Sequence, residues 1–139
     1  MTDGQRFVPM LAYEDASRAA EWLVSAFGFR EKERFADARG RVTDVVLTLG
    51  EHVLLAGSPS TVYQGPRRHA ETCDAARAWL DTPYILDGVL VYVDDVAAHL
   101  HRAKSAGARI LSDLETNPLQ RQYRCEDLEG HRWMFAERV

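Results

Sequence analysis

Apolar and polar positions along the chain follow one pattern twice. A strand is expected over Phe7–Tyr13, and it leads through an acidic pair into a helix whose apolar residues recur every three or four positions as far as Gly28. A second strand is expected over Gly88–Val93, followed by another acidic pair and another helix that ends at Gly107. Because order and spacing agree in the two stretches, the sequence predicts an internal repeat.

Both predicted helices carry suitable residues at their ends. Asp15 and Asp95 stand before the first turns, where a carboxylate can accept hydrogen bonds from free backbone N–H groups. Gly28 and Gly107 stand after the last turns, where a left-handed backbone costs glycine little. The sequence therefore fixes each helix at its beginning and at its end.

Further strands are expected after each helix, giving both copies the order βαβββ. They cover Phe29–Phe35, Val42–Leu49 and His52–Ala56 in the first copy, and Arg109–Leu111, Gln120–Glu126 and His131–Glu137 in the second.

The two copies are expected to belong to one domain that covers residues 1–139. Module one takes about residues 5–57, a linker takes 58–86, and module two takes about 87–138. The linker has no counterpart in the repeat, and its pattern predicts one extra helix over about His69–Leu80.

Composition is that of an ordinary soluble protein. The 139 residues are 46% hydrophobic and 27% charged, and the net charge is −4. A mildly acidic chain without a basic patch favours neither a nucleic-acid backbone nor an anionic membrane as partner. The two cysteines, Cys73 and Cys125, are too few for a disulfide framework. We therefore expect a cytoplasmic protein with no nucleic-acid or membrane partner.

Short motifs around both predicted helices and in the last predicted hairpin bear on the family to which the chain is similar. They are Tyr13-Glu14-Asp15-Ala16, Ala26-Phe27-Gly28-Phe29, Val93-Asp94-Asp95-Val96, Ala106-Gly107-Ala108 and the closing stretch Asp127-Leu128-Glu129-Gly130-His131-Arg132-Trp133. In this order and spacing they resemble the vicinal oxygen chelate superfamily, which contains glyoxalase I, extradiol dioxygenases and bleomycin-resistance proteins. A proline that is usual after the hairpin aspartate is Leu128 here.

The resemblance implies an α+β fold in which two βαβββ modules form a curved mixed sheet around a cleft, with an extra helix in the linker. Alternate strand residues should face this cleft, and an aromatic linker residue could close over it. The candidate ligand-binding residues are Asp44, Thr48, Trp79, Tyr84, Tyr92, Arg124 and Arg132. Arg124 depends on a strand register that the sequence leaves open. Such domains commonly pair, so a homodimer is expected.

Metal-dependent members of the superfamily hold a divalent ion with four side chains, one from each of four cleft strands. The resemblance places these positions at Val8, about Leu55, Gly88 and Met134. A divalent ion needs carboxylate or imidazole ligands, which none of these residues supplies. We therefore expect no metal and no other cofactor.

Three functions remain open from the sequence. The first is metal-independent binding or sequestration of a small organic molecule in the cleft, as in bleomycin-resistance proteins. The second is an isomerase or lyase that uses Asp44, Tyr92 or Arg132 for proton transfer or charge stabilisation. The third is a partner-binding domain whose linker helix makes the contact. Whether the chain catalyses a reaction is not decided by its sequence.

Overall fold

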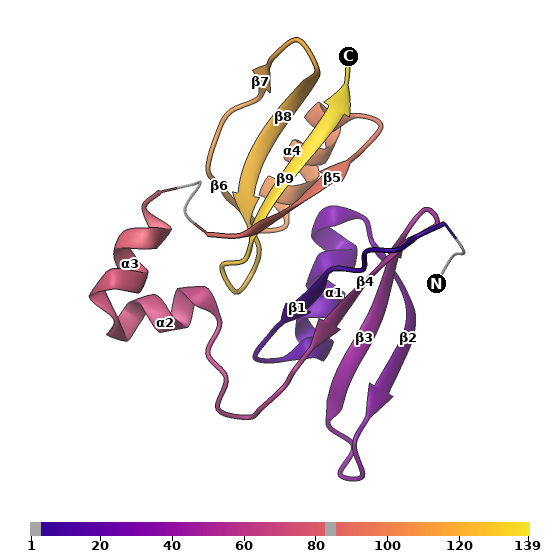
Figure 1. The fold of residues 1–139 in the computed structure, drawn as a ribbon, viewed down its shortest axis with the longest axis vertical. Helices are drawn as coiled ribbons and strands as arrows, with labels where there is room; N and C mark the ends of the chain where they lie inside the picture. The colour runs from indigo at the N-terminus through magenta and orange to yellow at the C-terminus, as the bar shows by residue number, and fades with distance from the viewer. Residues whose placement is uncertain (1–3, 83–85) are drawn as a thin grey trace. The chain divides into compact units, whose positions relative to one another are not determined.

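The computed structural model describes residues 4–82 and 86–139, so Tyr84 lies outside the described residues. The chain divides into two compact units, Met1–Gly65 and Pro66–Val139, which are described separately (Figure 1). Each unit contains a mixed sheet and a helix that follows its first strand. The predicted α+β class is confirmed.

Unit one has the predicted βαβββ order. Its elements are β1 (Met10–Ala12), α1 (Ala16–Phe27), β2 (Arg30–Ala36), β3 (Val42–Leu49) and β4 (His52–Gly57). The sheet order is β1-β4-β3-β2, with β1 parallel to β4 and the other pairs antiparallel. The first strand is shorter than expected, because Pro9 has no N–H to donate and contributes only its carbonyl to Leu55.

Unit two repeats this topology with additions. Its elements are α2 (Pro66–Thr72), α3 (Asp74–Leu80), β5 (Gly88–Tyr92), α4 (Val96–Ser105), β6 (Arg109–Ile110), β7 (Glu115–Thr116), β8 (Gln120–Glu126) and β9 (Arg132–Arg138). The order is β5-β9-β8-β6, with β5 parallel to β9 and β7 beside β8. The parallel pairs β1–β4 and β5–β9 correspond, which confirms the repeat. The short strand β7, between β6 and β8, was not among the strands expected from the sequence.

Both aspartate caps are confirmed. The Asp15 carboxylate accepts a hydrogen bond from Arg18 N, and the Asp95 carboxylate accepts one from Ala98 N, each at 3.0 Å. Gly28 has a φ of 86° and donates its N–H to Val24 O, as a left-handed helix end requires. The capping residues predicted from the sequence therefore make the hydrogen bonds that were expected of them.

The single helix expected over His69–Leu80 is wrong. Cys73 has an extended backbone, with φ −135° and ψ 113°, and separates α2 from α3. The break allows Ala70 on one helix and Ala76 and Leu80 on the other to share a small buried cluster with Cys73 and Leu86. An unbroken helix could not fold back on itself in this way.

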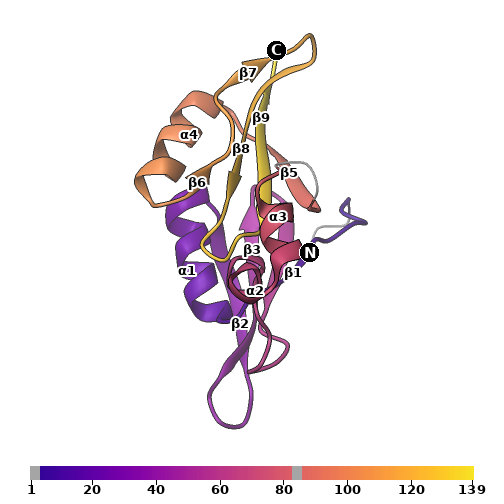
Figure 2. The same ribbon diagram turned by 90° about the vertical axis from the view of Figure 1, so that its left-hand side faces the viewer.

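Each unit buries one face of its sheet under its long helix (Figure 2). In unit one, Val45 and Leu47 of β3 are fully buried on the side that α1 covers. In unit two, α4 covers a layer of large side chains from the two central strands. This layer contains Tyr123, Cys125, Trp133 and Phe135. Burial raises the pKa of the Cys125 thiol, so this cysteine is a packing residue rather than a nucleophile. The opposite face of each sheet is thereby left for other contacts.

No helix within residues 4–82 and 86–139 combines the length and apolar character that a membrane span requires.

An ion pair on β2 gives unit one a measurable pH dependence. A register shift puts Glu31 and Arg34 on the same face of the strand, and Arg34 donates two hydrogen bonds to the Glu31 carboxylate, at 2.6 and 2.8 Å. These bonds lower the pKa of Glu31. A carboxylate whose pKa falls on folding stabilises the native state above the unfolded pKa, about 4.3, and loses that contribution as the pH drops through the native pKa.

Replacing Glu31 by glutamine should therefore lower the free energy of unfolding near neutral pH and have no effect in strong acid. Both side chains are about one-third exposed, so the loss should stay below about 1 kcal/mol. Urea unfolding across the acid range measures it. The matched variant Arg34→Gln should give the same pH profile, whereas an E31Q effect that is constant down to strong acid would contradict the assignment.

Candidate ligand-binding site

The face of the second sheet opposite α4 brings polar and apolar side chains of three strands together. The pairing places Leu90, Met134 and Arg124 in one row across β5, β9 and β8. A second row contains Gly88, Arg132 and Glu126, and a third contains Tyr92, Ala136 and Gln122. We call this surface the open face of unit two.

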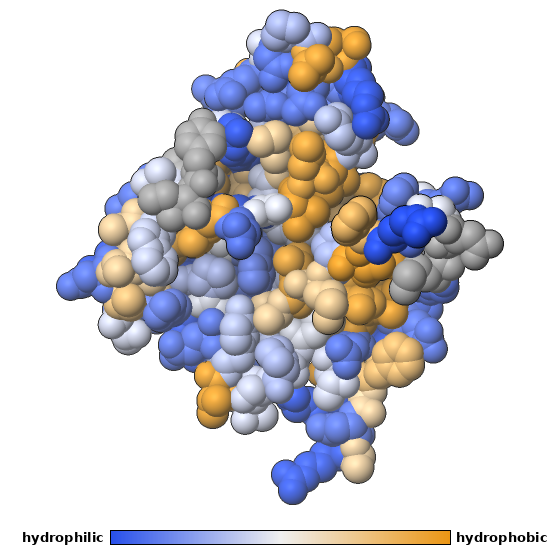
Figure 3. Space-filling model, in the orientation of Figure 1, coloured by the Kyte–Doolittle hydropathy of each residue, from blue (hydrophilic) through white to orange (hydrophobic). Residues whose placement is uncertain are grey.

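A hollow of about 230 Å³ lies on this face. Its lining is mostly apolar, with two guanidinium groups, and Figure 3 shows apolar side chains gathered over β5. The lining residues are Leu86, Gly88, Val89, Leu90, Leu111, Arg124, Arg132, Trp133 and Met134. Gly88 lies at the border of the hollow and lets β5 approach β9 closely, because a Cβ at this position would lie 3.0 Å from Arg132 O. An apolar hollow with few polar groups is typical of sites for organic ligands.

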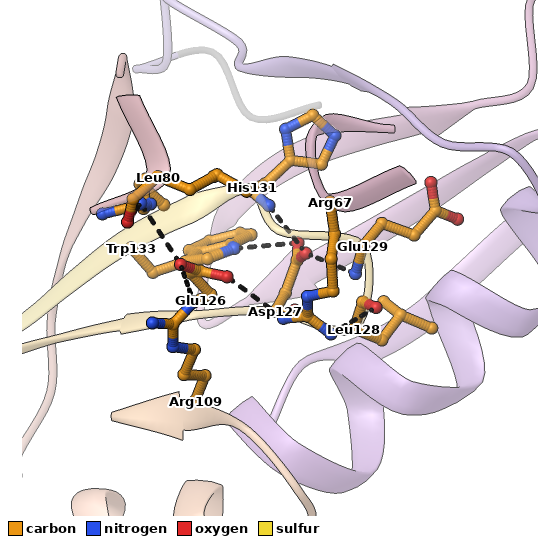
Figure 4. Close-up of polar contacts among 10 residues, drawn as sticks. Arg67, Leu80, Arg109, Glu126, Asp127, Leu128, Glu129, His131 and Trp133 are labelled. Atoms are coloured by element: carbon orange, nitrogen blue, oxygen red, sulfur yellow. Dashed lines mark hydrogen bonds and ion pairs between the residues drawn. The ribbon is translucent and has the colours of Figure 1, made fainter. Parts of the chain in front are cut away.

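A buried carboxylate lies beside the hollow. Glu126 is fully buried and is surrounded by the guanidinium groups of Arg67 at 3.2 Å, Arg132 at 3.2 Å and Arg109 at 3.5 Å (Figure 4). Arg132 also donates a hydrogen bond of 2.7 Å from Nη2 to Leu80 O at the end of α3. The linker helices are thus tied to the second sheet through charged side chains.

Arg132 is only 4% exposed. Burial lowers its pKa, and the carboxylate of Glu126 opposes this shift. Its Nε and Nη1 atoms are buried and have no hydrogen-bond partner among residues 4–82 and 86–139. Buried donors of this kind are rare in native proteins and call for an acceptor.

Asp127 fixes the β8–β9 hairpin from inside. Its Oδ1 accepts hydrogen bonds from the backbone N–H groups of Glu129 and His131, each at 3.0 Å, and its Oδ2 accepts one from Trp133 Nε1 at 3.1 Å (Figure 4). Arg67 closes the outside of the turn by donating to the carbonyls of Leu128 and Asp127. The register of Arg124 and Arg132 on the open face depends on this turn. His131 contributes backbone hydrogen bonds to this turn.

A polar border lies at the other end of the open face. Tyr92 donates its hydroxyl hydrogen to Gln120 Oε1 at 2.7 Å, and Gln120 donates to Gln122 Oε1 at 2.6 Å. The Arg138 guanidinium lies 3.7 Å from the centre of the Tyr92 ring. Tyr92 remains 38% exposed, so part of its side chain is accessible although Arg138 lies over its ring.

The strand residues among the candidates predicted from the sequence lie on two different sheets. Arg124 and Arg132 line the hollow, and Tyr92 shares the same face. Asp44 and Thr48 lie on the face of the first sheet opposite the α1-covered residues of β3. Thr48 Oγ1 donates to Arg30 O there at 3.4 Å.

Of the two linker candidates, Trp79 falls within the described residues. Trp79 lies on α3, is 44% exposed and is not among the residues that line the hollow. Tyr84 lies outside the described residues. A binding role for all seven candidates stays a prediction.

Sequence reasoning missed the charged cluster around Glu126. The alternation over Gln120–Glu126 puts Glu126 on the same face as Arg124 once the register is known, and the pair Arg124–Met134 now fixes that register. No sequence signal links Arg67 with a hairpin about sixty positions away.

The positions that the superfamily uses for metal ligands carry no donor set here. Gly88 and Met134 line the hollow of unit two, and Leu55 lies on β4 of unit one. Within the described residues, no group of three or more histidine, cysteine, aspartate or glutamate side chains is arranged to hold an ion. The residues present therefore do not fit the family-type metal site.

Two βαβββ modules, each with one helix-covered and one open sheet face, define the class of fold. A family model described as the Glyoxalase/Bleomycin resistance protein/Dioxygenase superfamily matches residues 7–135, and the chain belongs to this superfamily. No curated protein sequence matches the chain significantly.

Solved structures resemble the chain over nearly its whole length. TioX from Micromonospora sp. ML1 is 33% identical, with 97% of each chain covered and a TM-score of 0.69. TnmS3, an antibiotic binding protein from Streptomyces sp. CB03234, is 17% identical, with 99% of this chain and 100% of that chain covered and a TM-score of 0.62. A glyoxalase/bleomycin resistance protein/dioxygenase family enzyme from Burkholderia phytofirmans PsJN is 17% identical, with 94% and 95% covered and a TM-score of 0.64.

Proposed function

We propose that the chain binds a small organic molecule without a metal ion, on the open face of unit two, and sequesters it. The observation that carries this proposal is the apolar hollow whose lining includes Gly88 and Met134 where metal-dependent relatives would need ligands. Support also comes from the family, which includes bleomycin-resistance proteins, and from TnmS3, which is described as an antibiotic binding protein.

The volume of the hollow limits how much of a ligand it can enclose. Sites for drug-sized molecules measure roughly 300–1,000 Å³, and the hollow of about 230 Å³ is smaller. We infer that it receives one ring or side chain of a larger compound. The partly exposed side chain of Tyr92 offers a stacking surface for the remainder on the same face.

A thermal-shift screen with aromatic and peptide antibiotics, including neutral ones, tests the proposal. At least one compound should raise the melting temperature, because a ligand that binds only the native state stabilises it. The variant Leu90→Glu places a charge on the open face and should abolish that shift. The matched variant Leu119→Glu changes an exposed leucine away from the hollow and should keep it.

Recovery of the bound compound by mass spectrometry separates sequestration from catalysis. An unchanged compound agrees with the proposal, whereas a chemically altered one supports the isomerase or lyase alternative. Equal shifts in the two glutamate variants would contradict the placement of the site on unit two.

The proposal treats residues 1–139 as one binding domain that forms a homodimer. The edge strand β1 carries the exposed side chain of Met10, which gives a second copy an apolar surface to cover. Light scattering should give the mass of two chains, and the mass of one chain at micromolar concentration would contradict the dimer.

A further inference from the structure

Two nitrogen atoms of the buried Arg132 guanidinium have no hydrogen-bond acceptor in the part of the chain that the structure describes. Nη2 donates a hydrogen bond to Leu80 O and forms an ion pair with the Glu126 carboxylate. Nε and Nη1 have no hydrogen-bond partner within residues 4–82 and 86–139. Arg132 also belongs to the lining of the hollow. Leaving a buried donor unpaired costs stability, so an acceptor brought by a ligand would find these groups already in place.

The charged side chains that line the hollow are all of one sign. The described lining contains two of them, Arg132 on β9 and Arg124 on β8, and both are basic. The nearby Asp127 carboxylate accepts hydrogen bonds from hairpin N–H groups and from the Trp133 indole. The charge carried by the described lining itself is therefore positive, and its other residues are apolar.

We propose that the hollow recognises amphipathic organic acids, with Arg132 donating hydrogen bonds to the acidic group and Arg124 supplying a second positive charge. The apolar part of such a ligand packs against Leu90, Leu111 and Met134. The inference deepens the proposed binding function, on which it rests, by naming the chemistry of the ligand. A neutral ligand would leave the Arg132 donors without the charged acceptor that makes the strongest hydrogen bonds.

A pair of probes that differ only in charge tests the proposal on the full chain. The probes are 2-naphthoate and its neutral amide, 2-naphthamide, and their dissociation constants are measured by NMR titration of the ¹⁵N-labelled protein. We expect 2-naphthoate to bind about tenfold more tightly, the ratio that one charge-assisted hydrogen bond supports. The backbone signals that shift should belong to β5, β8 and β9.

Single substitutions test whether Arg132 and Arg124 cause the preference for 2-naphthoate over 2-naphthamide. Arg132→Lys keeps a positive charge beside Glu126 but removes the Nε and Nη1 donors, and Arg124→Gln removes the second charge. Each should weaken 2-naphthoate binding about tenfold and leave 2-naphthamide unchanged. Arg109→Gln is the matched control, because Arg109 also pairs with Glu126 and is not part of the lining.

The outcomes separate this inference from the proposed function. Equal affinity of the wild-type chain for both probes, or a 2-naphthoate preference that survives in R124Q and R132K, overturns the acid specificity and leaves small-molecule binding standing. Failure of both probes to bind also overturns the inference, while the antibiotic screen with its neutral compounds judges the proposed function independently. If R132K does not fold, the probe comparison on the wild type and on R124Q still decides.

Discussion

Replacing Glu126 by alanine is expected to lower the free energy of unfolding by about 3–5 kcal/mol. The substitution leaves the 4% exposed Arg132 guanidinium in the interior without its anion. It also removes one of the acceptors of Arg67, which connects α2 to the hairpin. An uncompensated buried charge costs more than the ion pair itself contributes, so the loss should be large. Urea unfolding followed by circular dichroism gives the difference.

A double variant checks the reason for this loss. In Glu126→Leu/Arg132→Met both charges are replaced by apolar groups of similar volume, and no buried ion remains. We expect it to be more stable than E126A, since apolar replacements of a buried pair are often neutral or stabilising. An E126A loss below about 1 kcal/mol, or a double variant less stable than E126A, would contradict the description of Glu126 as the counter-ion of Arg132.

Replacing Asp127 by alanine is expected to cost about 3 kcal/mol, because it removes the acceptor of hydrogen bonds from Glu129, His131 and Trp133. The Trp133 indole is 1% exposed, so its N–H would be left buried without a partner. Loss of the turn should also shift the NMR signals of Arg124 and Arg132, whose register depends on it. Urea unfolding measures the stability change.

The variant Asp127→Asn isolates the bond to Trp133. Asparagine keeps the Oδ1 acceptor for the two backbone N–H groups but turns an NH₂ donor toward the indole N–H, so about 1–2 kcal/mol should be lost. In the Trp133→Phe background, which has no indole N–H, the same D127N change should cost clearly less. Additive effects of D127N and W133F would show that the bond does not exist.

Local features of the fold could be predicted from the sequence because their causes are local. The caps at Asp15 and Asp95 and the helix end at Gly28 are set by hydrogen bonds within one turn. Strands β3 and β8 have the predicted bounds, since alternation is a property of the segment itself. The repeat followed from these local units once they were aligned.

Features that depend on distant contacts could not be predicted. The break at Cys73 arises because Ala70, Ala76 and Leu80 pack together, and a helical period cannot show that two parts of one stripe fold back on each other. The register of β8 became known only through the pair Arg124–Met134. The sequence showed that residues of this strand alternate between two faces, but it did not show which set lies on the open face.

The candidate site also combines features that the sequence could predict with features that depend on distant contacts. Tyr92, Arg124 and Arg132 lie on one face of the second sheet, where alternation allowed them to lie. Burial of Arg132 under the end of α3 was not foreseen, because it depends on Leu80 O, which comes from the linker. The sequence therefore indicated which side chains could face a ligand, while the structure shows that Arg132 has two donors without a partner among the described residues.

Calorimetric titration of chelator-treated protein with the strongest-binding compound of the antibiotic screen tests the central claim most directly. We predict saturable binding with a dissociation constant that does not change when zinc, nickel or manganese is added. The described lining of the hollow offers mostly apolar contacts, and the described residues contain no ligand set for an ion. Binding that vanishes in the chelator and returns with one of these metals would contradict the account.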